Sequence, residues 1–152
     1  MRLMMVTVGV AAALAAPAAL AQDQASVRAF LADIYRPYGS EKQQGPSLDH
    51  PRRWFEPVLA EAMRRDASQA ARRGEVGALD GDPFCDCQDF ERFTAKIGPI
   101  TLAKGGARAV VRFRNGRPMT LVYDLVSTRA GWRIRDISWP EGHLRGLFFK
   151  HR

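Results

Sequence analysis

The hydrophobic pattern of the chain changes its period once, close to residue 90. Before that point apolar residues recur at helical spacing, as Val27, Leu31 and Ile34 do. After it they alternate with polar residues, as around Val111 and Phe113, which is typical of strands that bury one face. Because the helices precede the strands and do not alternate with them, we predict an α+β domain.

The predicted elements follow from this pattern and from the Gly and Pro residues that interrupt it. The first helix begins at Asp23 or Ser26 and ends near Arg36-Pro37, and Gly74 ends the second. Short turns between the strands imply an antiparallel meander with one apolar face that holds the helices. We predict helices over residues 26–35 and 53–73, four strands over residues 93–97 or beyond, 107–114, 119–126 and 132–137, and a short helix near residues 144–148.

The register of the central hairpin can be predicted from burial. A two-residue turn at Asn115-Gly116 would pair Arg114 with Arg117 and place the arginines on the apolar face. Burial determines register more strongly than turn preference does. We therefore predict an odd-length loop, which pairs Phe113 with Met119.

The following turn should have an even-length loop, and a bulge is expected near Asp136. The face of the sheet that points away from the helices is then only half apolar. This open face could be a homodimer surface or a partner site, although single exposed valines are ordinary in strands. Its predicted members are Arg108, Val110, Arg112, Arg114, Thr120, Val122, Asp124 and Val126.

The N-terminal segment predicts export. Arg2 precedes an apolar run from Met4 to Leu14, Pro17 interrupts it, and Ala19-Leu20-Ala21 offers small residues to a signal peptidase. The run is too short to span a membrane. We predict a signal peptide over residues 1–21 with cleavage before Gln22, and a single domain over residues 22–152 with its core at about 25–149. The mature protein would be periplasmic or secreted.

The chain is basic, with 23 Lys and Arg against 16 Asp and Glu and a formal net charge of +7. Such a charge favours an acidic protein or an anionic envelope polymer as partner, although a solvated basic surface is also common. Export and the lack of a recognition motif argue against nucleic acid.

The charge is locally inverted between Asp80 and Asp89, where four acidic residues and both cysteines fall within ten positions. The plainest interpretation is a connector between helices and sheet, with Phe84 as its apolar anchor and Asp82 or Asp89 bonded to backbone N–H groups or to arginines. The members of this candidate binding or structural cluster are Asp82, Phe84, Cys85, Cys87, Gln88 and Asp89.

The sequence gives less support to a specific chemical role for this segment, such as a metal site. Phe84 and Cys85 occupy the fifth and sixth places of an EF-hand-like loop, where oxygen and glycine are expected, so only a looser calcium site is left. Cys85 and Cys87 could form a disulfide that closes a very small ring. Two thiols with one distant histidine, His143, make a weak zinc or copper signal. The sequence therefore assigns no catalytic residue, metal ligand or cofactor.

Several pieces of the chain together resemble an exported bacterial family called domain of unknown function 3828. The resemblance implies a cystatin-like, nuclear-transport-factor-2-like architecture and export, and because the family has no assigned reaction it implies no catalytic residues. The matching pieces are the Phe30-x4-Tyr35 helix, the Trp54-to-Met63 helix, Asp82-Pro83-Phe84, Gln88-Asp89, Val111-x-Phe113 and Gly131-Trp132-Arg133-Ile134-x-Asp136-Ile137.

On these grounds we expect a non-enzymatic domain that binds a small ligand or a protein in the bacterial envelope. It would use the hollow between helices and sheet or the open sheet face, an expectation that rests on analogy of fold. One alternative is a small enzyme that uses the hollow, with Asp82, Asp89, Asp136 or Tyr123 as acid or base. The other is an inhibitor or immunity-type protein that binds an acidic partner.

Overall fold

The computed structural model describes residues 15–40 and 45–149, with side chains from residue 23 onward. Residues 1–14, which form most of the predicted signal peptide, lie outside the described residues. Cleavage before Gln22 and export therefore stay predictions.

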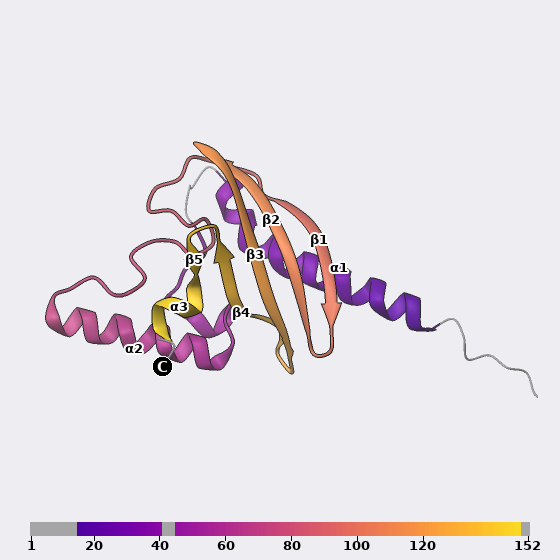
Figure 1. Ribbon diagram of the computed structural model, residues 1–152, viewed down its shortest axis with the longest axis horizontal. Helices are drawn as coiled ribbons and strands as arrows, with labels where there is room; N and C mark the ends of the chain where they lie inside the picture. Colours follow the sequence, from indigo (N-terminus) through magenta and orange to yellow (C-terminus); the bar gives the residue numbers. More distant parts are fainter. Residues whose placement is uncertain (1–14, 41–44, 150–152) are drawn as a thin grey trace, which may run out of the picture.

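The α+β class and the helix-before-strand order are confirmed (Figure 1). The strands form one antiparallel sheet in the order β1-β2-β3-β4-β5. The elements are α1 (Ala15–Tyr35), the 3-10 turns η1 (Arg36–Gly39) and η2 (Pro51–Arg53), α2 (Pro57–Arg73), β1 (Lys96–Ala103), β2 (Gly106–Asn115), β3 (Arg117–Thr128), β4 (Gly131–Trp139), β5 (Gly142–His143) and α3 (Leu144–Phe148).

Both long helices end where predicted, but neither begins there. The predicted start of α1 at Asp23 or Ser26 is wrong because the alanine-rich residues before them are strong helix formers and continue the helix. The predicted start of α2 near Arg53 or Trp54 is also wrong, because α2 begins at Pro57, whose ring suits the first helical position. Gly74 ends α2 with φ at 66°, in the left-handed region that glycine adopts without strain.

The residues before α2 are extended because they pair with the sheet. Phe55 forms a parallel bridge with Ile134. The N–H of Ile134 donates to the carbonyl of Trp54 at 2.8 Å, and the N–H of Glu56 donates to the carbonyl of Ile134 at 2.9 Å. This short segment therefore extends the sheet beside the first half of β4.

The predicted registers are confirmed. Phe113 pairs with Met119, and Arg114 lies opposite Pro118 instead of Arg117, as the odd loop requires. The next hairpin has an even loop between Thr128 and Gly131. The expected bulge also occurs, since Asp124 pairs with Asp136 while the adjacent Leu125 pairs with Ile134.

The sheet differs from the prediction at its two edges. It has five strands instead of four, because the turn at Pro140-Glu141 brings Gly142 and His143 back beside the end of β4. The first strand begins at Lys96 and not at Phe93, and it passes through Gly98-Pro99 by means of a register shift. Proline is tolerated there because β1 is an edge strand.

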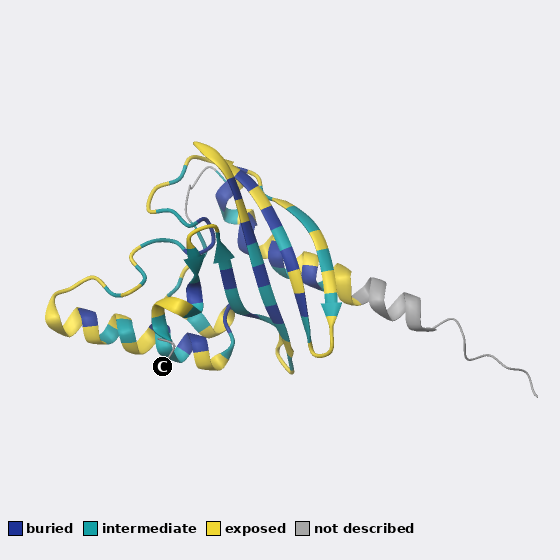
Figure 2. Ribbon diagram, in the orientation of Figure 1, coloured by how far each residue is buried: buried dark blue, intermediate teal, exposed yellow. Residues whose placement is uncertain are grey.

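The core lies between α1 and one face of the sheet, called here the inner face (Figure 2). The strands show the predicted alternation of buried and exposed residues. Val27, Leu31 and Ile34 of α1 are fully buried. The inner-face residues are Ala107, Ala109, Val111, Phe113, Met119, Leu121, Tyr123, Leu125, Ile134 and Ile137, and none is more than 7% exposed.

Helix α1 also covers the free edge of β1. Arg28 donates from Nη1 to the carbonyl of Ile97 at 2.7 Å, and Gln24 donates from Nε2 to the carbonyl of Ile100 at 3.1 Å. Because β1 is an edge strand, it has no further strand to donate hydrogen bonds to its carbonyl groups, and these two side chains donate instead. No helix in the described part of the chain is long and apolar enough to cross a membrane.

Candidate functional site

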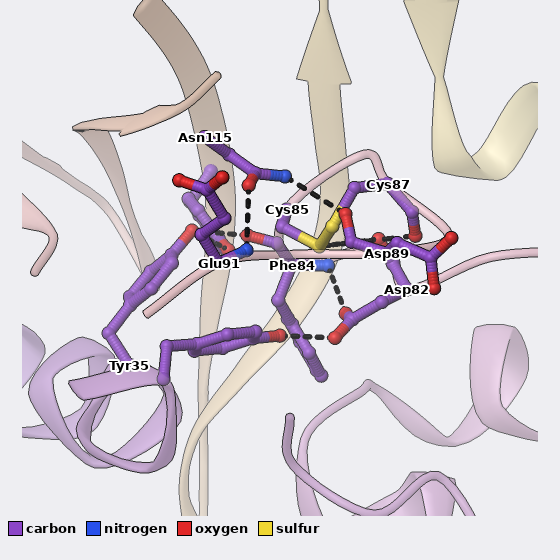
Figure 3. Close-up of a disulfide and its surroundings, with 10 residues drawn as sticks. Tyr35, Asp82, Phe84, Cys85, Cys87, Asp89, Glu91 and Asn115 are labelled. Carbon is purple, nitrogen blue, oxygen red and sulfur yellow. Dashed lines mark hydrogen bonds between the residues drawn. A yellow bond between two sulfur atoms is a disulfide. The ribbon is translucent and has the colours of Figure 1, made fainter. Parts of the chain in front are cut away.

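The acidic segment forms a small disulfide-closed hairpin at the joint between helices and sheet (Figure 3). Asp82 and Cys87 form an isolated antiparallel bridge, in which the N–H of Asp82 donates to the carbonyl of Cys87 at 2.8 Å. The disulfide joins Cys85 to Cys87. Asp86 between them has φ at 50°, the left-handed region that aspartate tolerates better than most residues do. The sequence left open whether Cys85 and Cys87 are bonded to each other, and in the structure they form a disulfide.

Phe84 anchors this hairpin in the core, as predicted. Its ring is fully buried and stacks on Phe55, with centroids 5.6 Å apart. Its carbonyl accepts a hydrogen bond of 2.8 Å from the Tyr35 hydroxyl. The anchor thus joins the connector to the start of α2 and to the end of α1.

Asp82 is bonded within this joint and not to an arginine. The Tyr38 hydroxyl donates to Oδ2, and the N–H of Phe84 donates to Oδ1 at 2.8 Å. Burial raises the pKa of Asp82 above its ordinary value, although both hydrogen bonds work to lower it. Of the two alternatives predicted for Asp82, bonding to a backbone N–H is the one found, and no arginine among the described residues pairs with it.

The tyrosines Tyr35, Tyr38 and Tyr123, which are all that the chain contains, gather around this joint. Tyr35 and Tyr123 share a hydrogen bond of 2.6 Å. Because the single hydroxyl hydrogen of Tyr35 goes to the carbonyl of Phe84, Tyr123 is the donor. Burial is the main reason that the pKa of each of these phenols is raised above 10. The cluster is a satisfied polar network inside the core.

The remaining members of the predicted cluster lie at the surface. Gln88 donates from Nε2 to Asp80 at 3.3 Å, and both residues are exposed. The carbonyl of Asp89 accepts from Asn115 Nδ2 at 3.1 Å, and Oδ1 of the same Asn115 accepts from the N–H of Glu91 at 3.1 Å. Asn115 therefore fastens the end of the connector to the β2–β3 hairpin.

Of the acids and bases named for the enzyme alternative, the structure brings only Tyr123 and Asp82 to one joint, inside the buried tyrosine network. Tyr123 is buried against Tyr35, while Asp136 accepts a hydrogen bond from the N–H of Arg145 and contacts His143 Nδ1 at 2.7 Å, where β4 meets α3. Within residues 15–40 and 45–149, no three His, Cys, Asp or Glu side chains converge in a way that could hold a metal ion.

The hollow between helices and sheet is filled. Phe113 stacks on Phe93 with centroids 4.5 Å apart, and Leu121 is fully buried. A pocket of about 280 Å³ opens at the surface beside the connector, lined in part by Asp82, Cys87 and Trp139. A larger groove of about 430 Å³ follows α2 and is lined mainly by apolar residues: Leu48, Pro51, Met63, Ala67, Ala70, Ala71, Leu79 and Phe148.

The opposite face of the sheet, called here the outer face, carries cations that form no ion pair within residues 15–40 and 45–149. Arg108, Arg112 and Arg114 are exposed, as the alternation predicts. The prediction missed Lys96, which lies directly opposite Arg112 on the neighbouring strand. The period-two pattern could have found it only if β1 had been given its correct bounds.

Comparison with known proteins supports the fold and leaves the family undetermined. No family model matches the chain. The uncharacterized protein YqhG of Escherichia coli strain K12 is 37% identical over 76 residues, which are 47% of this chain. The chain matches 25% of the length of that curated relative. The resemblance to domain of unknown function 3828 stays a prediction.

One solved structure shares the architecture, and a second is similar only at a lower level. A chain of the type VI effector–immunity complex Tae3–Tai3 from Ralstonia pickettii is 18% identical, with a TM-score of 0.53 over 85% of this chain and 97% of that one. A phospholipid-binding protein from Ralstonia solanacearum is also 18% identical, with a TM-score of 0.40 over 84% and 81% of the two chains. The first likeness shows the fold alone, and the second is too low to support an argument.

Proposed function

We propose that the protein is a binding protein of the immunity type, which recognises an acidic protein partner by surface contact. The observation that carries this proposal is the filled interior. The space between α1 and the sheet, where a small ligand would sit in a fold of this kind, is occupied by fully buried side chains such as Leu121 and Tyr123. Binding is therefore assigned to the outside of the domain.

The charge of the chain indicates the kind of partner. A formal net charge of +7 attracts acidic surfaces and speeds their encounter. The likeness to a chain of an effector–immunity complex, over 97% of that chain, supports the same class of function. The predicted signal peptide would place this activity in the bacterial envelope.

The proposal can be tested on exported proteins encoded beside this gene. The mature chain and each neighbouring product would be purified and mixed, and complexes would be sought by native mass spectrometry and calorimetry. We expect a one-to-one complex with an acidic partner, which weakens as salt is added because the charges are screened. Loss of the partner's toxicity in the complex would establish the immunity role.

The same mass spectra would also reveal a result that contradicts the proposal. A chain that binds none of these proteins, and that instead retains a small molecule after purification, would overturn the proposal in favour of small-ligand binding. The surface groove along α2 would then be the place to look for that molecule.

A further inference from the structure

The outer face of the sheet carries an unusual concentration of free positive charge. Lys96, Arg108, Arg112 and Arg114 are all exposed there, and Arg108 lies directly opposite the one acidic residue among their neighbours on β3, Asp124. None of the four takes part in an ion pair or side-chain hydrogen bond among the described residues, although other arginines do, such as Arg64 with Glu61. These four residues are called here the basic face.

Two of these cations lie side by side at a cost to the fold. Lys96 and Arg112 are direct cross-strand partners, and like charges in that position destabilise a sheet. The side chain of Arg112 reaches over β1, because its Nη1 is 2.9 Å from the position that a Cβ on Gly98 would take. The outer face therefore keeps two cations close together on neighbouring strands.

The centre of the same face is apolar. Val110 and Val122 pair with each other across β2 and β3, and both are half-buried. Helix α1 crosses behind the strands in Figure 1 and leaves this side without a helix. A half-apolar patch with charges around it has the composition of a protein interface, with an apolar centre and a polar rim.

We infer that the basic face is the surface that binds the partner, and that the partner presents carboxylates around an apolar patch. This inference rests on the proposed function and specifies where it acts. A guanidinium such as that of Arg112 can hold a carboxylate through two parallel hydrogen bonds, which gives orientation as well as attraction.

Two other occupants fit the face less well. A second copy of the chain, related by a twofold axis, would bring the same four cations against themselves. A membrane would require large apolar side chains that enter the lipid, and those among the described residues that are exposed, Val58, Val76 and Leu147, lie on other elements. An acidic protein surface matches both the charge of the rim and the apolar centre.

The first test uses poly-L-glutamate as a defined acidic probe at low salt, followed by amide NMR shifts and calorimetry. We expect shifts on β2 and β3, and about tenfold weaker binding in the Lys96→Glu, Arg112→Glu variant. Arg64→Glu with Arg65→Glu is the matched control, since it changes the net charge equally on α2. Both pairs are exposed, so near-ultraviolet circular dichroism should show an unchanged fold.

An equal loss in both variants, or shifts that map to α2, would overturn the basic face as a site and leave only attraction by net charge. Binding to phosphatidylglycerol vesicles in place of polyglutamate, or a dimer in sedimentation velocity that Arg112→Glu dissolves, would also overturn it. A neutral pair, Lys96→Thr with Arg112→Thr, repeats the comparison without charge reversal.

The second test separates this inference from the proposed function. If a neighbour-encoded partner binds the Lys96→Glu, Arg112→Glu variant as tightly as the wild type, the basic face is refuted and the immunity role stands. If the wild type recognises polyglutamate at the basic face but forms no complex with any of those proteins, the surface stands and the immunity role fails.

Discussion

The inner and outer faces of the sheet are built from alternate residues of the same strands, yet they satisfy different requirements. On the inner face Phe113 and Leu121 are buried against α1 and the aromatic connector. On the outer face Arg112 and Arg114, one residue before and after Phe113, form no ion pair among the described residues. The inner face stabilises the fold, whereas the outer face tolerates repulsion that folding alone does not require.

The largest expected effect is a loss of stability in alkaline solution, and it comes from the tyrosines buried on the inner side of the sheet. The pKa of each buried tyrosine is raised in the folded state, so stability from Tyr35, Tyr38 and Tyr123 is complete below pH 10 and is lost as pH rises further. At pH 11 we expect a loss of about 1.4 kcal/mol for each, or about 4 kcal/mol together. Tyrosinate absorbance should stay low until the chain unfolds, then appear in one step. Gradual ionisation in the folded chain would contradict the buried cluster.

Neighbouring residues on β3 allow a direct comparison of the two faces. Leu121→Ala removes a fully buried side chain and should lower the free energy of unfolding by about 3 kcal/mol. Val122→Ala, one position along and on the outer face, should cost less than about 1 kcal/mol. Urea unfolding of both variants measures the difference, and equal losses would mean that the outer face is covered in solution.

The next largest effect on stability concerns the Asp82 carboxylate and its hydrogen bond from Tyr38. Tyr38→Phe removes the hydroxyl that donates to Asp82 and should cost about 2 kcal/mol near neutral pH. Because the pKa of Asp82 is already raised, the stability it contributes is greatest below about pH 4 and is lost as pH rises through its folded pKa. The Tyr38→Phe variant should lose more stability than the wild type as pH rises, because the hydrogen bond that lowers the pKa of Asp82 is gone. Adding Asp82→Asn should abolish this pH dependence, and a persisting slope would assign it to another group.

The connector disulfide should contribute less, because it closes a loop of only three residues. Chain entropy for a ring of that size gives about 1.5 kcal/mol. Cys87→Ser should lower the free energy of unfolding by that amount, without exposing Phe84 to solvent. Intact mass should also show the wild type two hydrogens lighter than its reduced form, and equal masses would mean that the thiols are free.

The smallest expected effect has the opposite sign. Arg112→Thr removes the repulsion with Lys96 and should raise the free energy of unfolding by about 0.5 kcal/mol at low salt. High salt should erase the gain by screening. Arg64→Thr, which breaks an ion pair with Glu61, is the control and should not stabilise the protein. A loss of stability in Arg112→Thr would mean that this guanidinium serves the fold.

The features predictable from the sequence are those determined by local periodicity. Burial alone indicated the pairing of Phe113 with Met119 and the bulge near Asp136, because a shift of one residue would turn every side chain to the wrong face. The start of α2 was not predictable, because Phe55 is drawn into a bridge with Ile134 that is far away in sequence. Long-range pairing overrides local helix signals.

The candidate site was less predictable for the same reason. Asp82 showed a turn signal, but its partner Tyr38 is 44 positions away and no spacing rule connects them. Phe84 was identifiable as an anchor because it is the one large apolar residue between the acidic positions. Lys96 was missed as a partner of Arg112 because Gly98-Pro99 obscured the length of the edge strand.

The side chains of α1 that bond to β1 also limit how this protein can associate. With Arg28 on the carbonyl of Ile97 and Gln24 on that of Ile100, an incoming strand finds these acceptors already occupied. Strand addition, the route by which open edges recruit peptides or polymerise into fibrils, is thereby obstructed on this side. Growth of the sheet at β1 is therefore disfavoured, which is consistent with the inference that a partner binds its broad side.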